Sequence, residues 1–245
     1  MDILEIGTIN DKLQELVPSN TSMIMDKRKR LYTLLTLIDV DIPNYLCDAI
    51  DKIILSECND YIYIKSIPII KGRFRLYRGD ITKLEVDVIV NAANSKMLGC
   101  FNPSHKCIDN IIHSKAGPRL RMECRKIMNK CNTRDNKALI TRAYCLPSKY
   151  IIHIAGPIYD SCKDQSTDLA NCYLACLNIA RVNCLRSIAF CCISTGLYGY
   201  PKEDAAKIAI CTTKQWMKQK NYEIDIVFNT FTDEDTQIYK SLLQL

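Results

Sequence analysis

The chain has 245 residues and a formal net charge of +6, with 48% hydrophobic and 24% charged residues. This length and composition are ordinary for a globular protein with a sizeable core, and they allow one large domain with an appendage. The positive charge is mild and spread along the chain, apart from residues 27–30. We interpret that basic run as a solvated helix surface and predict no nucleic-acid partner.

The sequence shows no sign of a membrane-spanning or secreted protein. No stretch approaches the roughly 18 apolar residues of a membrane span, and the N-terminus lacks the basic flank and apolar core of a secretory signal. The 14 cysteines are too scattered, in too long a chain, for a disulfide scaffold. We therefore expect a reduced, cytoplasmic protein in which most cysteines are small core residues.

Residues 1–70 form a predicted α-helical N-terminal extension. A short helix is expected over residues 10–17, with Asn10 as its N-cap. A second helix carries an apolar face that begins at Leu31, and a proline suits the first turn of a third helix. Residues 61–70 are rich in β-formers but contain a proline, so we expect a linker or an edge strand there.

From Gly72 the pattern changes to an alternation of strands and helices. Several predicted strands are continuous apolar runs, which are typical of strands covered by helices on both faces. Residues 71–245 are therefore predicted to form an α/β domain, a three-layer α/β/α sandwich with a mixed, mostly parallel central sheet. The predicted strands are residues 74–77, 86–91, 138–143, 150–155, 187–193 and 224–228. The predicted helices are residues 108–116, 118–131, 168–184, 202–220 and 233–243, with Asp168 as one N-cap.

Two polar segments follow predicted strands and are candidate ligand contacts. Asp80 can accept hydrogen bonds from an exocyclic amine or a ribose; alternatively, it caps a helical turn over residues 82–85. Asn91 and Asn94 bracket two alanines, and their amides suit sugar hydroxyls. Because asparagines at strand ends are also common turn residues, neither segment alone identifies a ligand.

A third candidate is the loop over residues 194–200, which contains two glycines and follows a buried strand. Backbone N–H groups in such a loop, close to a helix N-terminus, bind phosphate oxygens. Tyr198 can pack on a sugar face. The alternative is a plain connection that uses glycine for its conformational freedom, and the sequence supports both interpretations equally.

Cys100, His105 and Cys107 form the most specific chemical feature, with the spacing C-x4-H-x-C. Two soft thiolates and one imidazole suit Zn²⁺, and three protein ligands leave a fourth tetrahedral position open, as in catalytic zinc sites. In a chain with 14 cysteines a chance match is the alternative, and spacing alone favours it. His113 and His153 fall inside a helix and a strand, where structural packing is expected.

Several motifs occur in order between Gly72 and the C-terminus. They are Gly79-Asp80-Ile81-Thr82, Asn91-Ala92-Ala93-Asn94, Ile112-His113-x-x-Ala116-Gly117, Leu146-Pro147-Ser148-Lys149-Tyr150, His153-Ile154-Ala155-Gly156-Pro157 and Ser194-Thr195-Gly196-Leu197-Tyr198-Gly199-Tyr200-Pro201. Together they resemble the macrodomain family, whose fold binds ADP-ribose. Most macrodomains have a run of glycines after the asparagines, whereas residues 99–107 replace it here. That replacement and the helical extension resemble the zinc-dependent branch of the family, in which Cys100, His105 and Cys107 become the expected zinc ligands.

The resemblance implies an ADP-ribose cleft at the strand ends. Asp80 and Ile81 match the adenine contacts, and Phe231 lies where related proteins place an aromatic residue near the adenine or its ribose. Asn94 matches the residue that touches the distal ribose, and Asp109 matches the aspartate that hydrolytic members use near the scissile bond. The diphosphate loop is matched by Ser194, Thr195, Gly196, Leu197 and Tyr198. At residues 132–137 many relatives have a Thr-Gly pair that this chain lacks, which weakens any ligand contact there.

The zinc branch is similar to enzymes that remove mono-ADP-ribose from acidic side chains. In bacteria and fungi it accompanies a sirtuin-like transferase and a lipoyl-carrier protein. The resemblance thus implies a zinc-dependent protein mono-ADP-ribosyl hydrolase. Its partners would be ADP-ribose and a mono-ADP-ribosylated protein, with a lipoyl-carrier-type protein as one candidate.

In the mechanism that we expect, Zn²⁺ acts as a Lewis acid at the distal ribose or its ester. Asn94 orients the ribose, and Asp109 orients or deprotonates the attacking water, unless it only caps its helix. The main alternative is a reader module that binds ADP-ribose without cleaving it. A zinc deaminase is excluded because the sequence contains neither of its motifs, His-x-Glu and Pro-Cys-x-x-Cys.

Overall fold

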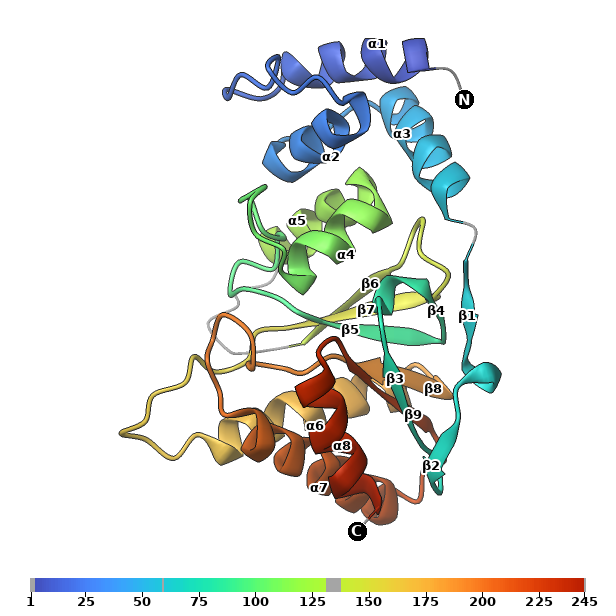
Figure 1. Cartoon of the computed structure of the whole chain (residues 1–245), viewed down its shortest axis with the longest axis vertical. Helices are drawn as coiled ribbons and strands as arrows, with labels where there is room; N and C mark the ends of the chain where they lie inside the picture. The colour runs from blue at the N-terminus through green and yellow to red at the C-terminus, as the bar shows by residue number, and fades with distance from the viewer. Residues whose placement is uncertain (1–2, 59, 131–137, 245) are drawn as a thin grey trace.

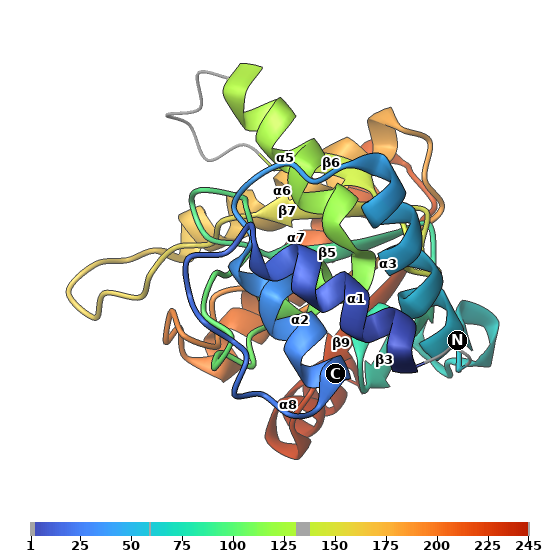
Figure 2. The same ribbon diagram turned by 90° about the horizontal axis from the view of Figure 1, so that it is seen from above.

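The computed structural model describes residues 3–58, 60–130 and 138–244, and Figure 1 shows that they are arranged in layers. A central sheet carries helices on both faces, as the sequence predicts for an α/β sandwich. The N-terminal helices form a further layer outside the helices on one face (Figures 1 and 2). The departure from the family pattern at residues 132–137 lies outside the described residues.

The central sheet is mixed and mostly parallel, as predicted. Its spatial order is β2 (Ile69–Lys71), β3 (Phe74–Arg78), β9 (Asp225–Thr230), β8 (Ser187–Phe190), β5 (Val88–Ala92), β7 (Tyr150–Ile154) and β6 (Leu139–Arg142). The five inner strands pair in parallel, whereas the edge strands β2 and β6 pair antiparallel with their neighbours. A separate parallel pair joins β1 (Ile62–Tyr63) to β4 (Leu84–Glu85).

Helices cover both faces of the sheet and bury its apolar strands. On one face lie α4 (Ile108–Ala116) and α5 (Pro118–Lys130); on the other lie α6 (Ser166–Val182), α7 (Lys202–Lys220) and α8 (Asp233–Gln244) (Figure 1). The bounds of α4 and α7 agree with the predicted ranges. All four residues of β8 are buried, which explains its continuous apolar pattern.

Two predicted helix caps are wrong. Asn10 lies inside α1 (Ile3–Gln14), where its buried Nδ2 donates to the Lys27 carbonyl over 2.8 Å. A long-range partner therefore replaces the local cap. Asp168 lies in the first turn of α6, whose N-cap is Gln165. An acidic residue still suits that position because the helix dipole is positive there.

The N-terminal helices have an apolar core of their own. α1 packs on α2 (Lys27–Leu37) and on α3 (Asn44–Glu57), and the buried side chains of all three helices form one cluster that Cys145 joins from the loop after β6. In turn α2 packs on α4, and α3 packs on α5. Pro43 is the N-cap of α3 and so lies just before the helical turn in which we expected it. The predicted edge strand is confirmed as β2.

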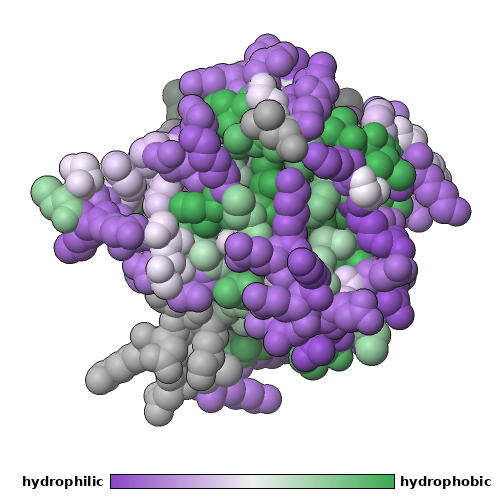
Figure 3. All heavy atoms as spheres, turned by 90° about the horizontal axis from the view of Figure 1, so that it is seen from below, coloured by the Kyte–Doolittle hydropathy of each residue, from purple (hydrophilic) through white to green (hydrophobic). Residues whose placement is uncertain are grey.

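The surface and the cysteines agree in part with the expectations from composition. Within the described ranges, no helix combines the length and apolar character that crossing a membrane requires. The described cysteines are all free thiols, but only six are buried and Cys211 is exposed, so fewer belong to the core than predicted. Figure 3 shows the face at the bottom of Figure 1, where hydrophilic side chains surround smaller hydrophobic areas.

Candidate active site

The carboxyl ends of the parallel strands meet at one edge of the sheet, which is where α/β proteins bind ligands. Asp80 follows β3, Asn94 follows β5, Gly156 follows β7, Ser194 follows β8 and Phe231 follows β9. The topology therefore brings the predicted adenine, ribose and diphosphate contacts to the same edge.

At the end of β3, Asp80 caps the 3₁₀ helix Ile81–Lys83. Its Oδ1 accepts hydrogen bonds from the backbone N–H and the hydroxyl of Thr82, at 2.9 and 2.7 Å. The capping interpretation is thus confirmed, and the second carboxylate oxygen is left for a ligand. Ile81 is buried below this turn, whereas Phe231 is 74% exposed, so its ring is accessible to a ligand.

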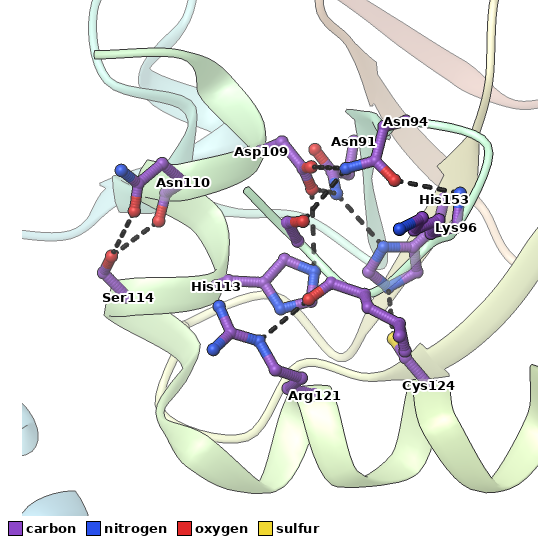
Figure 4. A network of polar contacts seen from close by, with 12 residues as sticks. Asn91, Asn94, Lys96, Asp109, Asn110, His113, Ser114, Arg121, Cys124 and His153 are labelled. Atoms are coloured by element: carbon purple, nitrogen blue, oxygen red, sulfur yellow. Dashed lines mark hydrogen bonds and ion pairs between the residues drawn. The ribbon is translucent and has the colours of Figure 1, made fainter. Parts of the chain in front are cut away.

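Asn91, Asn94 and Asp109 form the polar centre of this edge (Figure 4). Asn91 Nδ2 donates to Asp109 Oδ1 over 2.8 Å, and Asn94 Nδ2 donates to Asp109 Oδ2 over 3.2 Å. Asn94 Nδ2 also donates to the Gly99 carbonyl over 2.9 Å, while its Oδ1 accepts from the Lys96 N–H. Both Asn94 amide hydrogens are therefore used within the protein, and its Oδ1 keeps one lone pair that can accept from a ribose hydroxyl.

Asp109 is a buried carboxyl group, 4% exposed, in the first turn of α4. The N-cap of that helix is Cys107, so the alternative in which Asp109 only caps the helix is wrong. Burial raises the pKa of Asp109 to about 6, although hydrogen bonds from Asn91 and Asn94 oppose the shift. A carboxyl group with this pKa can take a proton from water and give it back near neutral pH.

Cys100, His105 and Cys107 converge in the loop between β5 and α4. Their potential ligand atoms all lie within 4.8 Å of one another, and Cys100 Sγ is 3.6 Å from His105 Nδ1. The two cysteines are half-buried and the histidine is exposed, so the group is open to solvent on one side. This donor set, its convergence and its open side fit a Zn²⁺ ion with one free coordination position.

The electrostatics of Cys107 depend on this clustering. Burial, followed by the neighbouring Cys100 thiol, raises the pKa of Cys107 to about 11, and a hydrogen bond from the Asn110 backbone opposes the shift. A divalent cation held by the two cysteines would favour thiolate over thiol. Metal binding at this loop therefore has to release protons.

Asn110 contacts the metal loop, which we define as residues 98–107, and it belongs to none of the candidate sets predicted from the sequence. Its side chain is buried, and Nδ2 donates to the Asn102 carbonyl over 3.1 Å and to the His105 carbonyl over 2.9 Å. Both amide hydrogens thus hold the loop. A polar residue on the buried face of the helix at 108–116 was the signal that could have found it.

Arg121 is the second residue that sequence reasoning missed. It is 7% exposed, and its Nε donates to the Leu98 carbonyl over 2.8 Å. Its guanidinium carbon lies 4.4 Å from the centre of the Phe101 ring, which is cation–π distance. The buried face of α5 also carries Leu120 and Cys124, so a charged residue among them was the available signal.

His113 and His153 are core residues, as predicted. His153 Nδ1 lies 3.1 Å from Asn91 Nδ2, and its Nε2 lies 3.0 Å from Thr141 Oγ1. Burial lowers the pKa of His153 to about 3. With Cys124, the two histidines form a second group of potential metal ligands. All three are buried and both His153 nitrogens already have partners, so this group belongs to the hydrogen-bond network below the strand end (Figure 4).

The loop after β8 has an unusual backbone. Ser194 has φ +66°, which non-glycine residues rarely adopt, and its buried Oγ has no hydrogen-bond partner among the described residues. The Gly156 backbone passes so close that a Cβ there would lie 2.2 Å from Ser194 Oγ. Leu197 is 75% exposed, and its backbone N–H has no acceptor within the described chain. A free N–H and an unpaired hydroxyl are groups that phosphate oxygens can satisfy.

The remaining residues of this loop support its shape. Thr195 Oγ1 donates to the Cys192 carbonyl over 3.0 Å, and the Gly196 carbonyl accepts from the Gly199 N–H over 3.0 Å. The Tyr198 carbonyl accepts from Tyr159 N–H, which ties the loop to the segment after β7. These contacts make a closed turn before α7.

Comparisons with known proteins point to one family. Residues 90–209 match the sequence model described as Macro domain. A protein of Staphylococcus aureus named "Protein-ADP-ribose hydrolase" is 44% identical over 200 residues, which cover 78% of this chain and 75% of that protein. A human protein named as an ADP-ribose glycohydrolase is 49% identical over 168 residues, which cover 67% of this chain and 38% of that protein. The crystal structure of a Trypanosoma brucei macrodomain in complex with ADP-ribose superimposes with a TM-score of 0.66 at 28% identity, covering 94% of each chain.

Proposed function

This chain belongs to the macrodomain family, and we propose that it is a zinc-dependent hydrolase that removes mono-ADP-ribose from acidic side chains of modified proteins. The hydrolase names of the relatives and the macrodomain complex with ADP-ribose support hydrolysis and ADP-ribose binding. The zinc ion is supported by the metal loop. The acidic acceptor is supported by the resemblance to the zinc-dependent branch of the family.

One observation carries the proposal. A single connection, from the end of β5 to the first turn of α4, contains Asn94, Asp109 and the thiol–imidazole group of the metal loop. A ligand-binding module has little need for an open metal position beside a buried carboxyl group. The combination therefore favours hydrolysis over binding alone.

The reaction is the hydrolysis of an ester between the distal ribose and a side-chain carboxyl group. Water attacks either the anomeric carbon or the acyl carbon, and the bond between that carbon and the bridging oxygen breaks. Water supplies a hydroxyl group to the attacked carbon and a proton to the leaving oxygen. Both routes yield free ADP-ribose and a free carboxyl side chain.

The polar centre supplies the proton acceptor and the orientation. Asp109 accepts a proton from the attacking water, and its burial keeps its pKa close enough to neutrality for that role. Asn91 and Asn94 fix the two carboxylate oxygens of Asp109. The remaining lone pair of Asn94 Oδ1 accepts a hydrogen bond from a distal ribose hydroxyl.

Cys100, His105 and Cys107 would hold the Zn²⁺ ion beside this centre. When bound, the ion supplies Lewis acidity at the distal ribose or its ester. The loop after β8 would anchor the diphosphate with Ser194 and Leu197. Asp80, Ile81 and Phe231 would contact the adenosine end, so that binding energy far from the reacting bond positions that bond.

The test measures release of ADP-ribose from a mono-ADP-ribosylated protein. The substitution Cys100→Ala is expected to slow the release of ADP-ribose at least about 10-fold, because it removes one of the three proposed metal ligands. A chelator should do the same to the wild-type chain, and added zinc should restore the wild type but not the variant. Cys211→Ala is the matched control, since Cys211 is exposed on α7. Unchanged release in both the variant and the chelated wild type contradicts the zinc mechanism.

The second candidate function is a reader module, and experiments with ADP-ribose distinguish it from the hydrolase. Calorimetry should show that the chain binds ADP-ribose, because binding is common to both functions. A reader binds ADP-ribose but releases none from a modified protein over hours. That result would assign the binding function and reject the hydrolase.

We extend the proposal to a lipoyl-carrier-type protein as the modified partner. Only the resemblance to the zinc branch supports this partner. Release of ADP-ribose should then be faster from a modified lipoyl carrier than from an unrelated protein that carries the same ester. Equal rates would show that the enzyme does not select this partner.

A further inference from the structure

The metal loop has little structure of its own. Residues 102–106 are exposed, and the internal contacts of the loop are short turns such as the Ser104 N–H to Asn102 Oδ1 bond over 3.0 Å. A loop that buries few apolar groups costs conformational entropy to order. Its shape therefore depends on contacts from neighbouring elements.

Asn110 makes the first of these contacts and connects the loop to the N-terminal helices. Its two amide hydrogens bind the carbonyl groups of Asn102 and His105. His105 is itself a proposed zinc ligand, and Asn102 lies close to Cys100 in sequence. The hydroxyl of Thr36, which is buried near the C-terminus of α2, lies 3.0 Å from Asn110 Oδ1 and 2.9 Å from the Tyr32 carbonyl, so its single hydrogen is shared between these two acceptors. Ser114 Oγ lies 3.1 Å from the same Asn110 oxygen. The Asn110 amide is thus linked to α2 as well as to its own helix. Figure 4 shows Asn110 on the side of α4 that faces away from His113.

Arg121 makes the second connection. It holds the loop on either side of Cys100, through the Leu98 carbonyl and the Phe101 ring. Its Nη1 donates to the carbonyls of Leu35, Thr36 and Ile38 at the end of α2, at 3.0, 3.2 and 2.5 Å. A cation is favoured there because the helix dipole is negative at that end. The α2 carbonyls therefore fix the guanidinium that fixes the loop.

We propose that the N-terminal helices clamp the metal loop through Thr36, Asn110 and Arg121, and thereby set how tightly the chain retains its metal. These three are positioning residues, since they act on the loop of Cys100, His105 and Cys107 through backbone carbonyl groups and through one another. The proposal rests on the zinc site of the proposed function. It also gives residues 1–70 a role, because the end of α2 is part of the site that holds the loop.

The first variant removes one hydroxyl group from the clamp. Thr36→Val keeps the side-chain shape but loses the contacts of the hydroxyl with Asn110 and with the Tyr32 carbonyl. The contact with Asn110 is worth a factor of about 2 to 10 in an equilibrium. The full-length chain loaded with zinc is mixed with a chromogenic chelator, and the rate of zinc loss is measured. We expect that rate to rise by about that factor. The control is Thr33→Val on the same helix, where the hydroxyl bonds only to the Lys29 carbonyl, and its zinc loss should match the wild type.

The second readout needs no metal. In the chelated chain, amide hydrogen exchange over residues 98–107 should accelerate in Thr36→Val but not in Thr33→Val, while exchange in α6–α8 stays unchanged. Asn110→Ala removes both loop bonds, so it should weaken zinc affinity by about 10- to 100-fold. If Asn110→Ala does not fold, the two threonine variants still decide the question.

The outcomes separate the clamp from the proposed function. Unchanged zinc loss and unchanged loop exchange in Thr36→Val overturn the clamp, whatever the enzyme does. Faster loop exchange in a chain whose wild type retains no zinc shows that the helices order the loop, but it overturns both metal retention and the zinc mechanism. Faster zinc loss together with faster loop exchange supports the clamp.

Discussion

At the scale of single residues, Asp109 combines a structural role with the proposed catalytic role, and the same carboxyl group serves both. Its carboxylate oxygens are the acceptors for Asn91 and Asn94, so it ties the end of β5 to α4. The same burial that makes these bonds strong raises its pKa to about 6. A catalytic role and a structural role therefore have to be distinguished by which measurement changes.

Asp109→Ala should slow release of ADP-ribose by about 100-fold or more, because it removes the proposed acceptor of the proton from water. The dissociation constant for ADP-ribose should change only a few-fold, since the proposed site assigns most of the binding contacts to Asp80 and the loop after β8. Single-turnover release and calorimetry on the same preparation measure the two quantities.

A purely structural Asp109 gives the opposite result. Loss of the carboxyl group then weakens ADP-ribose binding and lowers the melting temperature, while the single-turnover rate at saturating substrate stays within about 3-fold of the wild type, well short of the loss expected of a proton acceptor. That combination would remove Asp109 from the mechanism and leave the metal loop alone as the reactive group.

At the scale of elements, the sequence predicts those features that short-range residue patterns control. The helices at 108–116 and 202–220 have the predicted bounds because the apolar period is regular and one end of each is marked in the sequence, by Gly117 after the first and Pro201 before the second. The caps at Asn10 and Asp168 were misplaced, since the Asn10 side chain finds a partner in Lys27 that no local pattern reveals. Long-range contacts overrode the local rule in that case.

The same division applies to the candidate site. The proposed zinc ligands lie within eight residues, so their spacing was visible in the sequence. Asn110 and Arg121 were invisible because their importance depends on carbonyl groups of α2, which is distant in sequence. Ser194 was predicted as a loop residue, but no sequence pattern revealed its left-handed backbone, its unpaired hydroxyl or its closeness to Gly156.

The contact between the loops after β7 and β8 gives a test at this scale. In Gly156→Ala the new Cβ would lie 2.2 Å from Ser194 Oγ and 2.7 Å from a methyl carbon of Ile193. Overpacking of this kind should lower the free energy of unfolding by about 1 to 3 kcal/mol, and displacement of Ser194 should weaken ADP-ribose binding. Urea unfolding and calorimetry measure these effects.

Gly196→Ala is the control for stability in that experiment. A Cβ at Gly196 meets nothing within 4 Å, and its backbone is not in the left-handed region. Its free energy of unfolding should stay within about 1 kcal/mol of the wild type. If Gly156→Ala is as stable as this control, the two loops do not depend on their close approach.

At the scale of the whole molecule, two cores are joined by polar residues. The larger core lies around the sheet, and the smaller one lies among α1, α2 and α3. The buried cation of Arg121 connects them through carbonyl groups of α2, and the carboxyl group of Asp109 and the histidines His113 and His153 are buried as well. Polar groups at this depth make the stability of the chain depend on pH.

The pH dependence should come largely from the two buried histidines. The folded pKa of His153 is about 3, below its ordinary value, because burial disfavours the imidazolium; burial shifts the pKa of His113 in the same direction. A depressed histidine pKa contributes stability that is complete above about pH 6.5 and is lost as the pH falls toward the folded value. Asp109 opposes this trend, because its raised pKa favours the folded state at low pH.

His153→Gln isolates one of these contributions. Between pH 7.5 and 5.0 the wild type should lose about 2 kcal/mol more unfolding free energy than the variant, at about 1.4 kcal/mol per pH unit below the ordinary histidine pKa. Urea unfolding at both pH values, with chelator present so that metal does not contribute, measures the difference. Equal losses in the wild type and His153→Gln would mean that His153 is not held neutral by its burial, and the network below the strand end would then carry charge.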